Sequence, residues 1–313
     1  MAKLTHEGQR AVVTGAGKGI GRAHALELGR RGVSVVVNDF DRAAADAVVA
    51  EIKSGGGKAV ANYDSVGGKA AGQSIIDAAV REFGGLEIVI NNAGFLRTNM
   101  FENMTEAQID AILEVHLLGT IYVTQAAWPI MQKQKYGRVV ITSSASGMFA
   151  HQGQINYCSA KAGCYGLTKA LAYEGQDHGV KVNALLPMAP TGIDRYDPIP
   201  NMAEEFAKFI TPQLRDETAG ATNDTPEMIA YMAAYLVSRE CEVTGEAYSI
   251  CRGRFGRVFV GVADGWLTRK GDDVSAETVA DHLAQIRDIS HSSAPKWLYD
   301  EVRDVTLRLQ QAR

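Results

Sequence analysis

Three polar side chains with a defined spacing could carry out proton-transfer chemistry in this chain. They are Ser144, Tyr157 and Lys161, and the last two are four positions apart. Residues at i and i+4 share one face of a helix, so the ammonium of Lys161 can lie beneath the phenol of Tyr157. A phenol with a pKa of about 10 is a weak base at neutral pH, and a nearby positive charge favours its phenolate. The spacing predicts proton transfer to or from an alcohol, provided that another group carries the hydride.

The elements that must position these side chains follow from the alternation of two patterns. Short β-branched runs predict strands at 11–14, 33–37, 58–62, 88–90, 139–142, 180–186 and 247–251, and longer amphipathic patterns predict helices at 20–31, 41–53 and 74–83. Most of the strand segments are almost wholly apolar, which is typical of strands buried on both faces. The alternation predicts an α/β fold in three layers, a parallel sheet with helices on both sides.

Two regions depart from this alternation. Six of the eight prolines lie between Pro187 and Pro226. We expect residues 188–226 to form a lid over the substrate, at the carboxyl edge of the sheet where ligands bind, with a plain surface loop as the alternative. The tail shows a helical pattern with cap residues near Ser275. The predicted organisation is a catalytic domain at 1–262 and a helical extension at 263–313.

Composition and charge argue against several classes of protein. The chain has 313 residues, of which 46% are hydrophobic, and it carries a net charge of −4 with a pI near 6.0. The absence of a basic excess argues against a nucleic-acid partner. No apolar stretch reaches the length of about 18 residues that spans a bilayer, and the N-terminus does not resemble a signal peptide. We therefore expect a cytoplasmic protein without a membrane partner.

The cysteines predict neither a metal site nor a disulfide framework. The four are Cys158, Cys164, Cys241 and Cys251, and their spacing forms no CxxC pair or ligand cluster. Reduced thiols are the expectation for a cytosolic protein. Cys158 adjoins the proposed base, but nothing in the sequence would activate it as a nucleophile, so we interpret it as a packed side chain.

A glycine-rich turn follows the first predicted strand. The segment Thr14–Gly21 reads T-G-x-x-x-G-x-G and leads into a helix. Glycines permit a tight turn and close backbone approach to a pyrophosphate, and the helix N-terminus favours its negative charge. The turn therefore predicts a dinucleotide site whose candidate contacts are Gly15, Lys18, Gly19, Ile20 and Gly21.

The end of the second predicted strand bears on which dinucleotide is bound. Asp39 can accept hydrogen bonds from both adenosine ribose hydroxyls, and its charge repels a 2′-phosphate. Lys18 in the glycine turn argues in the other direction, because an ammonium can meet a phosphate. We give Asp39 the greater weight and predict NAD, since the carboxylate would occupy the place of the phosphate. The alternative role for Asp39 is that of a turn or capping residue.

Further cofactor contacts are predicted where the next two strands end. Asp64 and Ser65 follow the third strand and could reach the adenine edge. Asn91-Asn92-Ala93-Gly94 follows the fourth. Ala93 and Gly94 allow backbone contact with a ribose, Asn91 is a candidate cofactor contact, and an asparagine side chain of this motif can tie neighbouring strands together. Taken alone, the second motif would read as a plain turn.

Together, these motifs and Tyr157-Cys158-Ser159-Ala160-Lys161 resemble the short-chain dehydrogenase/reductase family over residues 8 to 251. The resemblance implies a Rossmann-like doubly wound parallel sheet, a nicotinamide cofactor, and a homodimer or homotetramer assembled through long helices. It implies that Tyr157 is the general acid/base, that Lys161 holds the nicotinamide ribose and lowers the tyrosine pKa, and that Ser144 positions the substrate oxygen. Pro187 and Thr191 would contact the nicotinamide amide.

Three longer segments of the sequence match one subgroup of this family. Segments 58–66, 133–138 and 143–147 are similar to the dehydrogenase domains of type 2 peroxisomal multifunctional enzymes. Those domains oxidise (3R)-hydroxyacyl-CoA thioesters, and vertebrate versions also act on 17β-hydroxysteroids. The hydratase and sterol-carrier domains that follow in those enzymes have no counterpart here, so we expect a stand-alone dehydrogenase.

The chain departs from the family pattern at two places. His116 stands where the family often has the asparagine of a proton relay. The relay could survive through a backbone carbonyl at this position, and for the side chain we favour a hydrogen-bonded structural histidine over a proton shuttle. The usual Pro-Gly after the sixth strand is Pro187-Met188 here.

The sequence predicts an NAD-dependent oxidation of a secondary alcohol, with a (3R)-hydroxyacyl-CoA as substrate and a steroid-CoA as a variant of it. A free 17β-hydroxysteroid is the alternative substrate, and a sugar or polyol is less favoured. A cofactor-binding regulator without catalysis is the alternative of a different class, and the presence of all three catalytic side chains argues against it.

Overall fold

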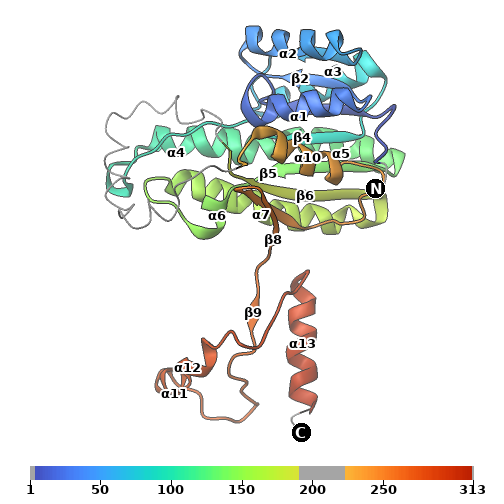
Figure 1. The fold of residues 1–313 in the computed structure, drawn as a ribbon. Coiled ribbons are helices and arrows are strands. Elements are labelled where there is room, and N and C mark those ends of the chain that lie inside the picture. The colour runs from blue at the N-terminus through green and yellow to red at the C-terminus, as the bar shows by residue number, and fades with distance from the viewer. Residues whose placement is uncertain (1–3, 190–222, 312–313) are drawn as a thin grey trace. The chain divides into compact units, whose positions relative to one another are not determined.

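The computed structural model describes residues 4–189 and 223–311 (Figure 1). Contacts divide the chain into two compact units, residues 1–257 and residues 258–313. Most of the predicted lid, residues 190–222, and with it Thr191, lies outside the described residues. The last position of the predicted lid, Pro226, is the first residue of a helix that Thr225 caps.

A sheet of eight strands runs through the described part of the first unit, in the order β3-β2-β1-β4-β5-β6-β7-β8. The strands are β1 (Arg10–Thr14), β2 (Ser34–Asn38), β3 (Lys58–Asn62), β4 (Ile88–Asn91), β5 (Gly137–Thr142), β6 (Val180–Pro187), β7 (Ala247–Cys251) and β8 (Arg254–Val258). Pairing is parallel from β3 through to β7. Only two residues connect β7 to β8, which is the length of a hairpin connection. The predicted α/β fold is confirmed.

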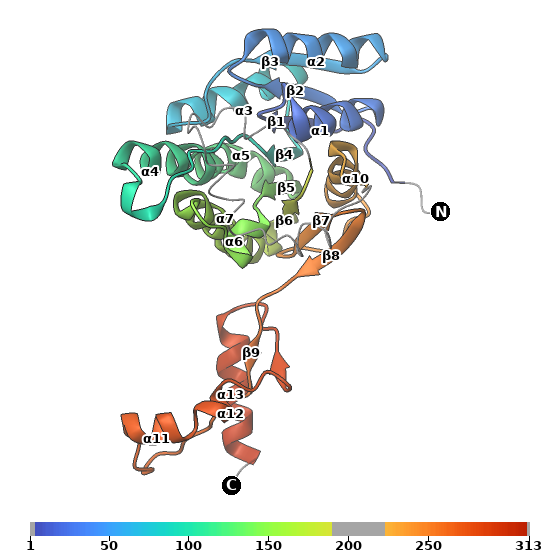
Figure 2. The same ribbon diagram turned by 60° about the vertical axis from the view of Figure 1, so that its left-hand side comes forward.

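Helices cover both faces of this sheet and form three layers (Figure 2). The helices are α1 (Gly19–Arg30), α2 (Arg42–Ser54), α3 (Lys69–Phe83), α4 (Glu106–Leu113), α5 (Gly119–Gln134), α6 (Ala145–Phe149), α7 (Ile155–Glu174) and α10 (Pro226–Leu236). One apolar core joins the sheet to α1, α2 and α10, and a second joins it to α3, α5 and α7. Strands between two cores are buried on both faces, which explains why their sequences are nearly all apolar.

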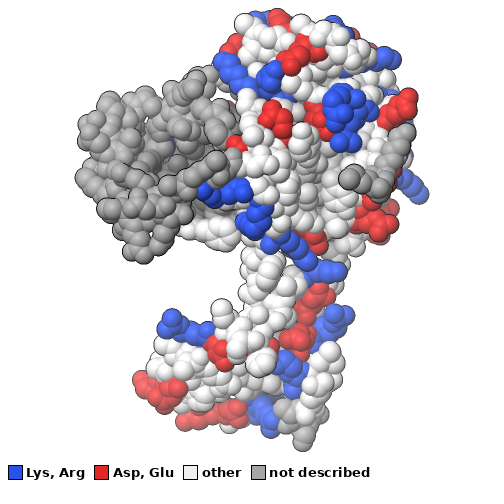
Figure 3. Space-filling view, viewed as in Figure 1, with Lys and Arg blue, Asp and Glu red and all other residues white. Residues whose placement is uncertain are grey.

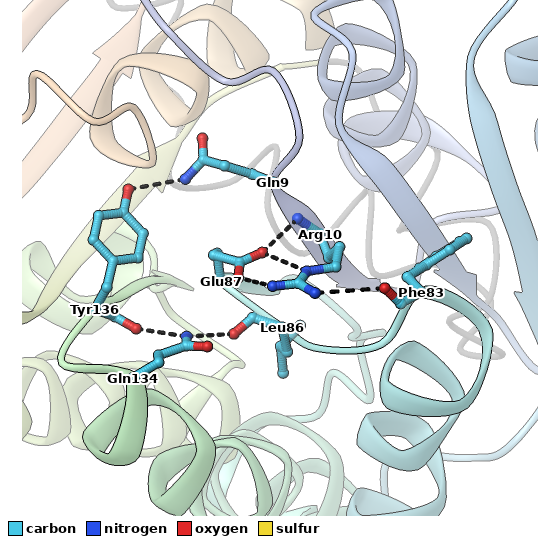
Figure 4. A network of polar contacts seen from close by, with 7 residues as sticks. All are labelled: Gln9, Arg10, Phe83, Leu86, Glu87, Gln134 and Tyr136. Atoms are coloured by element: carbon cyan, nitrogen blue, oxygen red, sulfur yellow. Dashed lines mark hydrogen bonds and ion pairs between the residues drawn. The ribbon is translucent and has the colours of Figure 1, made fainter.

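A polar network fastens the amino ends of the strands, at the edge opposite to the predicted site (Figure 4). The carboxylate of Glu87 accepts from the backbone N–H of Arg10 at 2.8 Å and from its guanidinium. The Gln134 amide donates to the carbonyls of Leu86 and Tyr136 at 2.6 and 2.7 Å. These bonds tie the starts of β1, β4 and β5 to the end of α5, so the strands reach the opposite edge in fixed register.

The second unit contains short elements and one longer helix. They are β9 (Val262–Ala263), α11 (Ala276–Asp281), α12 (Leu283–Ile286), β10 (Ser292–Ser293) and α13 (Leu298–Gln311). Ser275 caps α11 as expected, but His282 separates α11 from α12, where the sequence suggested one continuous pattern. None of the helices in the described ranges is long and apolar enough to cross a membrane.

Candidate active site

The carboxyl ends of the parallel strands bring the predicted site residues to one edge of the sheet. The turn after β1 carries the glycines, Asp39 follows β2, and Asp64 lies two residues after β3. Ser144 comes two residues after β5 and caps the short helix α6. In open α/β sheets this edge is where ligands bind, so strand order places the glycine turn and the proposed catalytic residues on the same side.

Tyr157 and Lys161 lie on one face of α7, as their spacing predicts. The Lys161 ammonium lies 5.6 Å from the centroid of the Tyr157 ring and donates to the Thr142 carbonyl at 2.5 Å. The Ser144 hydroxyl lies close enough to the phenol of Tyr157 to lower its pKa. Lys161 is buried, and its burial lowers the pKa of the ammonium. The three side chains therefore form one polar group between the end of β5 and the start of α7.

The protonation of Tyr157 differs from the sequence-based expectation. Burial raises the pKa of Tyr157 to about 12, and the hydrogen bond from Ser144 lowers it by a smaller amount. Desolvation disfavours the charged phenolate, and in this pocket it is the largest influence on the pKa of Tyr157. The protein alone therefore holds Tyr157 as a neutral phenol at neutral pH, ready to donate a proton.

Buried polar residues that the sequence did not single out fix the start of α7. The Asn156 side chain donates to the carbonyls of Arg97 and Gln108, each at 2.9 Å, and accepts from the Tyr157 backbone N–H at 2.7 Å. The Ser143 hydroxyl donates to the Lys161 carbonyl at 2.7 Å. The only sequence signal for Asn156 and Ser143 is that each adjoins a candidate catalytic residue.

His116 packs directly against Tyr157. It lies in a π-helical turn, Glu114–Leu118, and its ring meets the Tyr157 ring edge-on with centroids 5.1 Å apart. Nε2 lies 2.7 Å from the Phe95 carbonyl oxygen and Nδ1 has no hydrogen-bond partner among the described residues. Burial and the Lys161 charge hold the pKa of His116 well below its usual value. A neutral, buried ring that bonds to the backbone agrees with the structural role that we favour.

The backbone carbonyl of His116 is also engaged. It accepts from the Thr120 hydroxyl at 2.8 Å and from the Cys164 thiol at 3.3 Å. π-helical turns displace backbone groups from regular helical bonding and are frequent at functional sites. Here the displaced carbonyl finds its partners in α5 and α7, so the turn joins these helices beneath the site.

The glycine turn is held tightly by the loop after β4. Gly15 has a φ of +61°, and a Cβ there would lie 2.7 Å from the Ala93 Cα, while one on Gly21 would lie 2.0 Å from the Gly15 carbonyl oxygen. The Asn92 amide donates to the carbonyls of Thr14 and Gly15 at 3.1 and 3.2 Å. Larger residues at these two glycines would displace the backbone, so the turn depends on them.

Asp39 and Lys18 lie beside each other but have different partners. The Asp39 carboxylate accepts from the backbone N–H of Gly17 at 2.9 Å and from that of Asp41 at 3.0 Å. The Lys18 ammonium forms an ion pair with Asp41 at 2.7 Å. Asp41 was not among the sequence candidates, and its only signal was its place as the predicted start of a helix.

Several other predicted cofactor residues have their side chains bonded within the protein. The Asn91 amide is buried and donates to the Thr124 hydroxyl at 2.9 Å, which leaves Asn92, rather than Asn91, against the glycine turn. The Asp64 carboxylate accepts from Asn62 at 2.9 Å and from the Ser74 hydroxyl at 2.7 Å. The Ser65 hydroxyl accepts from the Gly67 N–H at 3.3 Å.

The remaining candidates have simple surroundings. Pro187 ends β6 opposite Ile250. Burial raises the pKa of the Cys158 thiol, which fits a packed side chain better than a nucleophile. No group of three or more metal-ligating side chains occurs among the described residues.

The geometry and charge at the glycine turn indicate whether a dinucleotide phosphate could bind there. α1 begins at Gly19, has no acidic residue in its first turn and, within the described chain, receives no side-chain cap from Lys18. Its first N–H groups therefore face the turn with a positive helix dipole, as an anion requires. Together with the parallel sheet, this arrangement is that of a Rossmann-like α/β fold whose first helix begins in a turn suited to an anion.

Comparison with known proteins identifies the family. A profile described as short chain dehydrogenase matches residues 9–194. The chain is 41% identical to a short-chain type dehydrogenase/reductase of Mycobacterium tuberculosis, over 89% of this chain and 94% of that protein. The chain belongs to the short-chain dehydrogenase/reductase family and is an oxidoreductase.

Two further relatives are longer proteins. The peroxisomal hydratase-dehydrogenase-epimerase of Neurospora crassa is 37% identical over 94% of this chain and 32% of its own length. The structure of full-length peroxisomal multifunctional enzyme type 2 from Drosophila melanogaster superposes with a TM-score of 0.77 at 32% identity. The superposed region covers 99% of this chain and 50% of the Drosophila chain. The resemblance to these enzymes is confirmed, and the chain spans a third to a half of them.

Proposed function

We propose that this protein oxidises the hydroxyl of a (3R)-hydroxyacyl-CoA thioester to a ketone with NAD as hydride acceptor. The observation that carries the proposal is the 37% identity, over nearly the whole chain, to an enzyme whose name joins a hydratase to a dehydrogenase. A hydratase adds water across a double bond and so produces an alcohol, which is the substrate that a dehydrogenase requires.

The proposed mechanism assigns one proton path to the residues of the site. The Ser144 hydroxyl and Tyr157 hold the substrate oxygen between them, and the Tyr157 phenolate takes the hydroxyl proton. Because burial raises the pKa of Tyr157, alcohol oxidation needs additional positive charge to favour the phenolate. The Lys161 ammonium on the same face of α7 is already present in the protein, so this further charge has to come from the bound cofactor. In the reverse direction the neutral phenol returns the proton.

Bound nicotinamide supplies the hydride acceptor and a second positive charge. We propose that the pyrophosphate of NAD is surrounded by Gly15, Gly19, Ile20 and Gly21. Asp39 is proposed to accept hydrogen bonds from the hydroxyls of the adenosine ribose. Ala93 borders the same turn, Gly94 is a further predicted contact, and Lys161 is proposed to hold the other ribose. Asp64, Ser65, Asn91, Pro187 and Thr191 remain predicted contacts.

We propose that phosphates of CoA are met by basic residues of the tail, with solvated surface side chains as the alternative. These residues are Arg252, Arg254, Arg257, Arg269 and Lys270. Arg254 and Arg257 lie on β8, where they bond to Ser249 at 3.1 Å and to Glu246 at 3.4 Å. Arg269 and Lys270 lie in the second unit. On the face drawn in Figure 3, basic and acidic side chains are interspersed, which fits a small-molecule substrate better than a nucleic acid.

We further propose a homo-oligomer that assembles through α5 and α7. A groove of about 280 Å³ between these helices is lined mainly by apolar side chains, among them Ile121, Trp128, Leu167 and Leu171. An apolar groove on two long helices is a surface that a second copy could bury. A cytoplasmic location also remains a prediction.

Replacing Tyr157 with Phe tests the proposed acid/base. Phenylalanine keeps the ring but removes the proton carrier, so we expect turnover to fall by at least about 1,000-fold while the Kd for NAD changes little. The variant Tyr165→Phe, on the same helix, is the matched control. Retained turnover in Tyr157→Phe would overturn the assignment.

A substrate panel tests the rest of the proposal. Steady-state rates with (3R)- and (3S)-hydroxyacyl-CoA, a steroid-CoA and free 17β-hydroxysteroids would be compared, each with NAD and NADP. We expect the highest kcat/KM for a (3R)-thioester with NAD. A preference for the free steroids would favour the alternative substrate, and binding of NAD without any turnover would favour the regulator.

A further inference from the structure

The ion pair between Lys18 and Asp41 lies at the place where the cofactor's adenosine end is proposed to bind. Lys18 precedes the first residue of α1 and Asp41 precedes that of α2. The ammonium lies 2.7 Å from one oxygen of Asp41, whose other oxygen accepts from the Ala44 N–H at 3.1 Å. Asp41 is therefore fixed by its own helix while it holds the lysine.

The pair is linked to Asp39 through the backbone. Asp39 accepts from the N–H of Gly17, the neighbour of Lys18, and from the N–H of Asp41 itself. Two carboxylates and one ammonium thus gather within a few residues of each other, and their net charge is negative. Arg42, which follows Asp41 in the chain, has its guanidinium 4.3 Å from the centroid of the Tyr63 ring.

We propose that Asp41 is a specificity-determining residue that rejects NADP by engaging Lys18. This inference rests on the proposed dinucleotide site. A 2′-phosphate beside Asp39 would need a cation, and Lys18 is the basic residue of the glycine turn. While Asp41 holds the ammonium, a phosphate must break an existing ion pair and approach two carboxylates instead of one. The hydroxyls of NAD meet no such repulsion.

Asp41→Asn is the direct test. Asparagine caps a helix as well as aspartate, so α2 keeps its start while Lys18 loses its charged partner. We expect the Kd for NADP, measured by isothermal titration calorimetry, to fall about tenfold as the released ammonium pairs with phosphate. The Kd for NAD should stay within about twofold, since its ribose carries no charge at that position. Asp41→Ser, which also caps, is the second variant if the first does not fold.

Lys18→Ala completes a double-mutant cycle. In the parent protein this change should leave the Kd for NADP within about twofold, because Lys18 is held by Asp41. In the Asp41→Asn background it should abolish the gain. Glu51→Gln is the matched control, since Glu51 also lies on α2 and pairs with Arg22 of α1 at 2.6 Å.

The outcomes separate this inference from the proposed function. An unchanged Kd for NADP in Asp41→Asn, or weaker NADP binding in Lys18→Ala alone, would overturn the role of Asp41. A parent protein that binds NADP more tightly than NAD would instead refute the proposed cofactor. The cycle would still measure whether Asp41 restrains Lys18.

Discussion

At the scale of single residues, burial determines the chemistry of the site as much as residue type does. Tyr157, Lys161 and His116 are close together, and desolvation favours the neutral form of each. A site of this kind holds an uncharged phenol until additional charge arrives. Proton transfer is then coupled to the binding of cofactor and substrate. Tyr157, a weak base while the site is empty, can become a phenolate once that charge is bound.

Replacing His116 distinguishes a structural role of its side chain from a role as a proton shuttle. His116→Phe keeps a ring against Tyr157 but loses the bond to Phe95. We expect the free energy of unfolding to fall by about 1–3 kcal/mol. Because the pKa of His116 lies well below its usual value, the pH profile of kcat should keep its position.

The exposed His151→Phe serves as the control for this measurement. A proton shuttle would behave differently, because its removal lowers kcat by about 100-fold or more without loss of stability. That result, or a displaced pH profile, would contradict the structural role of His116.

At the scale of elements, α1 has two functions that make different demands on its sequence. Its N-terminus faces the glycine turn, and its body packs against α10 and α2. His24 lies on the packed part with 1% of its surface exposed, and neither ring nitrogen has a partner among the described residues. A polar ring in an apolar layer stays neutral, because protonation would bury an uncompensated charge.

Because His24 is buried as a neutral ring, we expect the free energy of unfolding to fall in mild acid. Its pKa is lowered from 6.5 to about 3 by burial, so below pH 6.5 the unfolded chain takes up a proton that the folded protein does not. Stability is lost by about 1.4 kcal/mol per pH unit over that range, which amounts to about 2 kcal/mol at pH 5. His24→Leu should reduce the difference between pH 7 and pH 5 by that amount in urea unfolding.

The other histidines with lowered pKa values, His6 and His116, are present in parent and variant and cancel in this comparison. His178→Leu, at a half-buried turn after α7, is the matched control variant. An identical pH dependence in His24→Leu and the parent would show that His24 is not the group responsible.

At the scale of the whole molecule, the first unit has two complete cores, whereas none of the described residues of the second unit is buried. On α13, Leu298, Val302 and Leu307 are exposed. This exposed apolar surface, like the groove on α5 and α7, is one that a second copy could cover. It supports the proposal that copies of the chain associate.

A charge in the groove should separate the copies. Gln125→Arg places a cation on the exposed rim of the groove without disturbing either core, and Leu167→Asp places an anion within it. We expect light scattering after gel filtration to report a dimer or tetramer for the parent and a monomer for both variants. Gln73→Arg, on α3, should leave the mass unchanged. A monomeric parent, or an undiminished mass in both variants, would contradict assembly through this groove.

Local patterns explain what the sequence could predict. The apolar runs that became β1 to β7 report burial on both faces, and the spacing of Tyr157 and Lys161 follows from helix geometry alone. The glycine turn lies within one short segment. Each of these signals depends on neighbours in the chain, so none required knowledge of the tertiary structure.

The sequence by itself determined the fold class, the family and which residues meet at the carboxyl edge of the sheet. Only the tertiary structure decided their electrostatic state and partners. Burial raised the pKa of Tyr157, Asp41 paired with Lys18, and Asn92 rather than Asn91 met the glycine turn. Desolvation and ion pairing depend on groups from distant segments, and a one-dimensional pattern does not contain those distances.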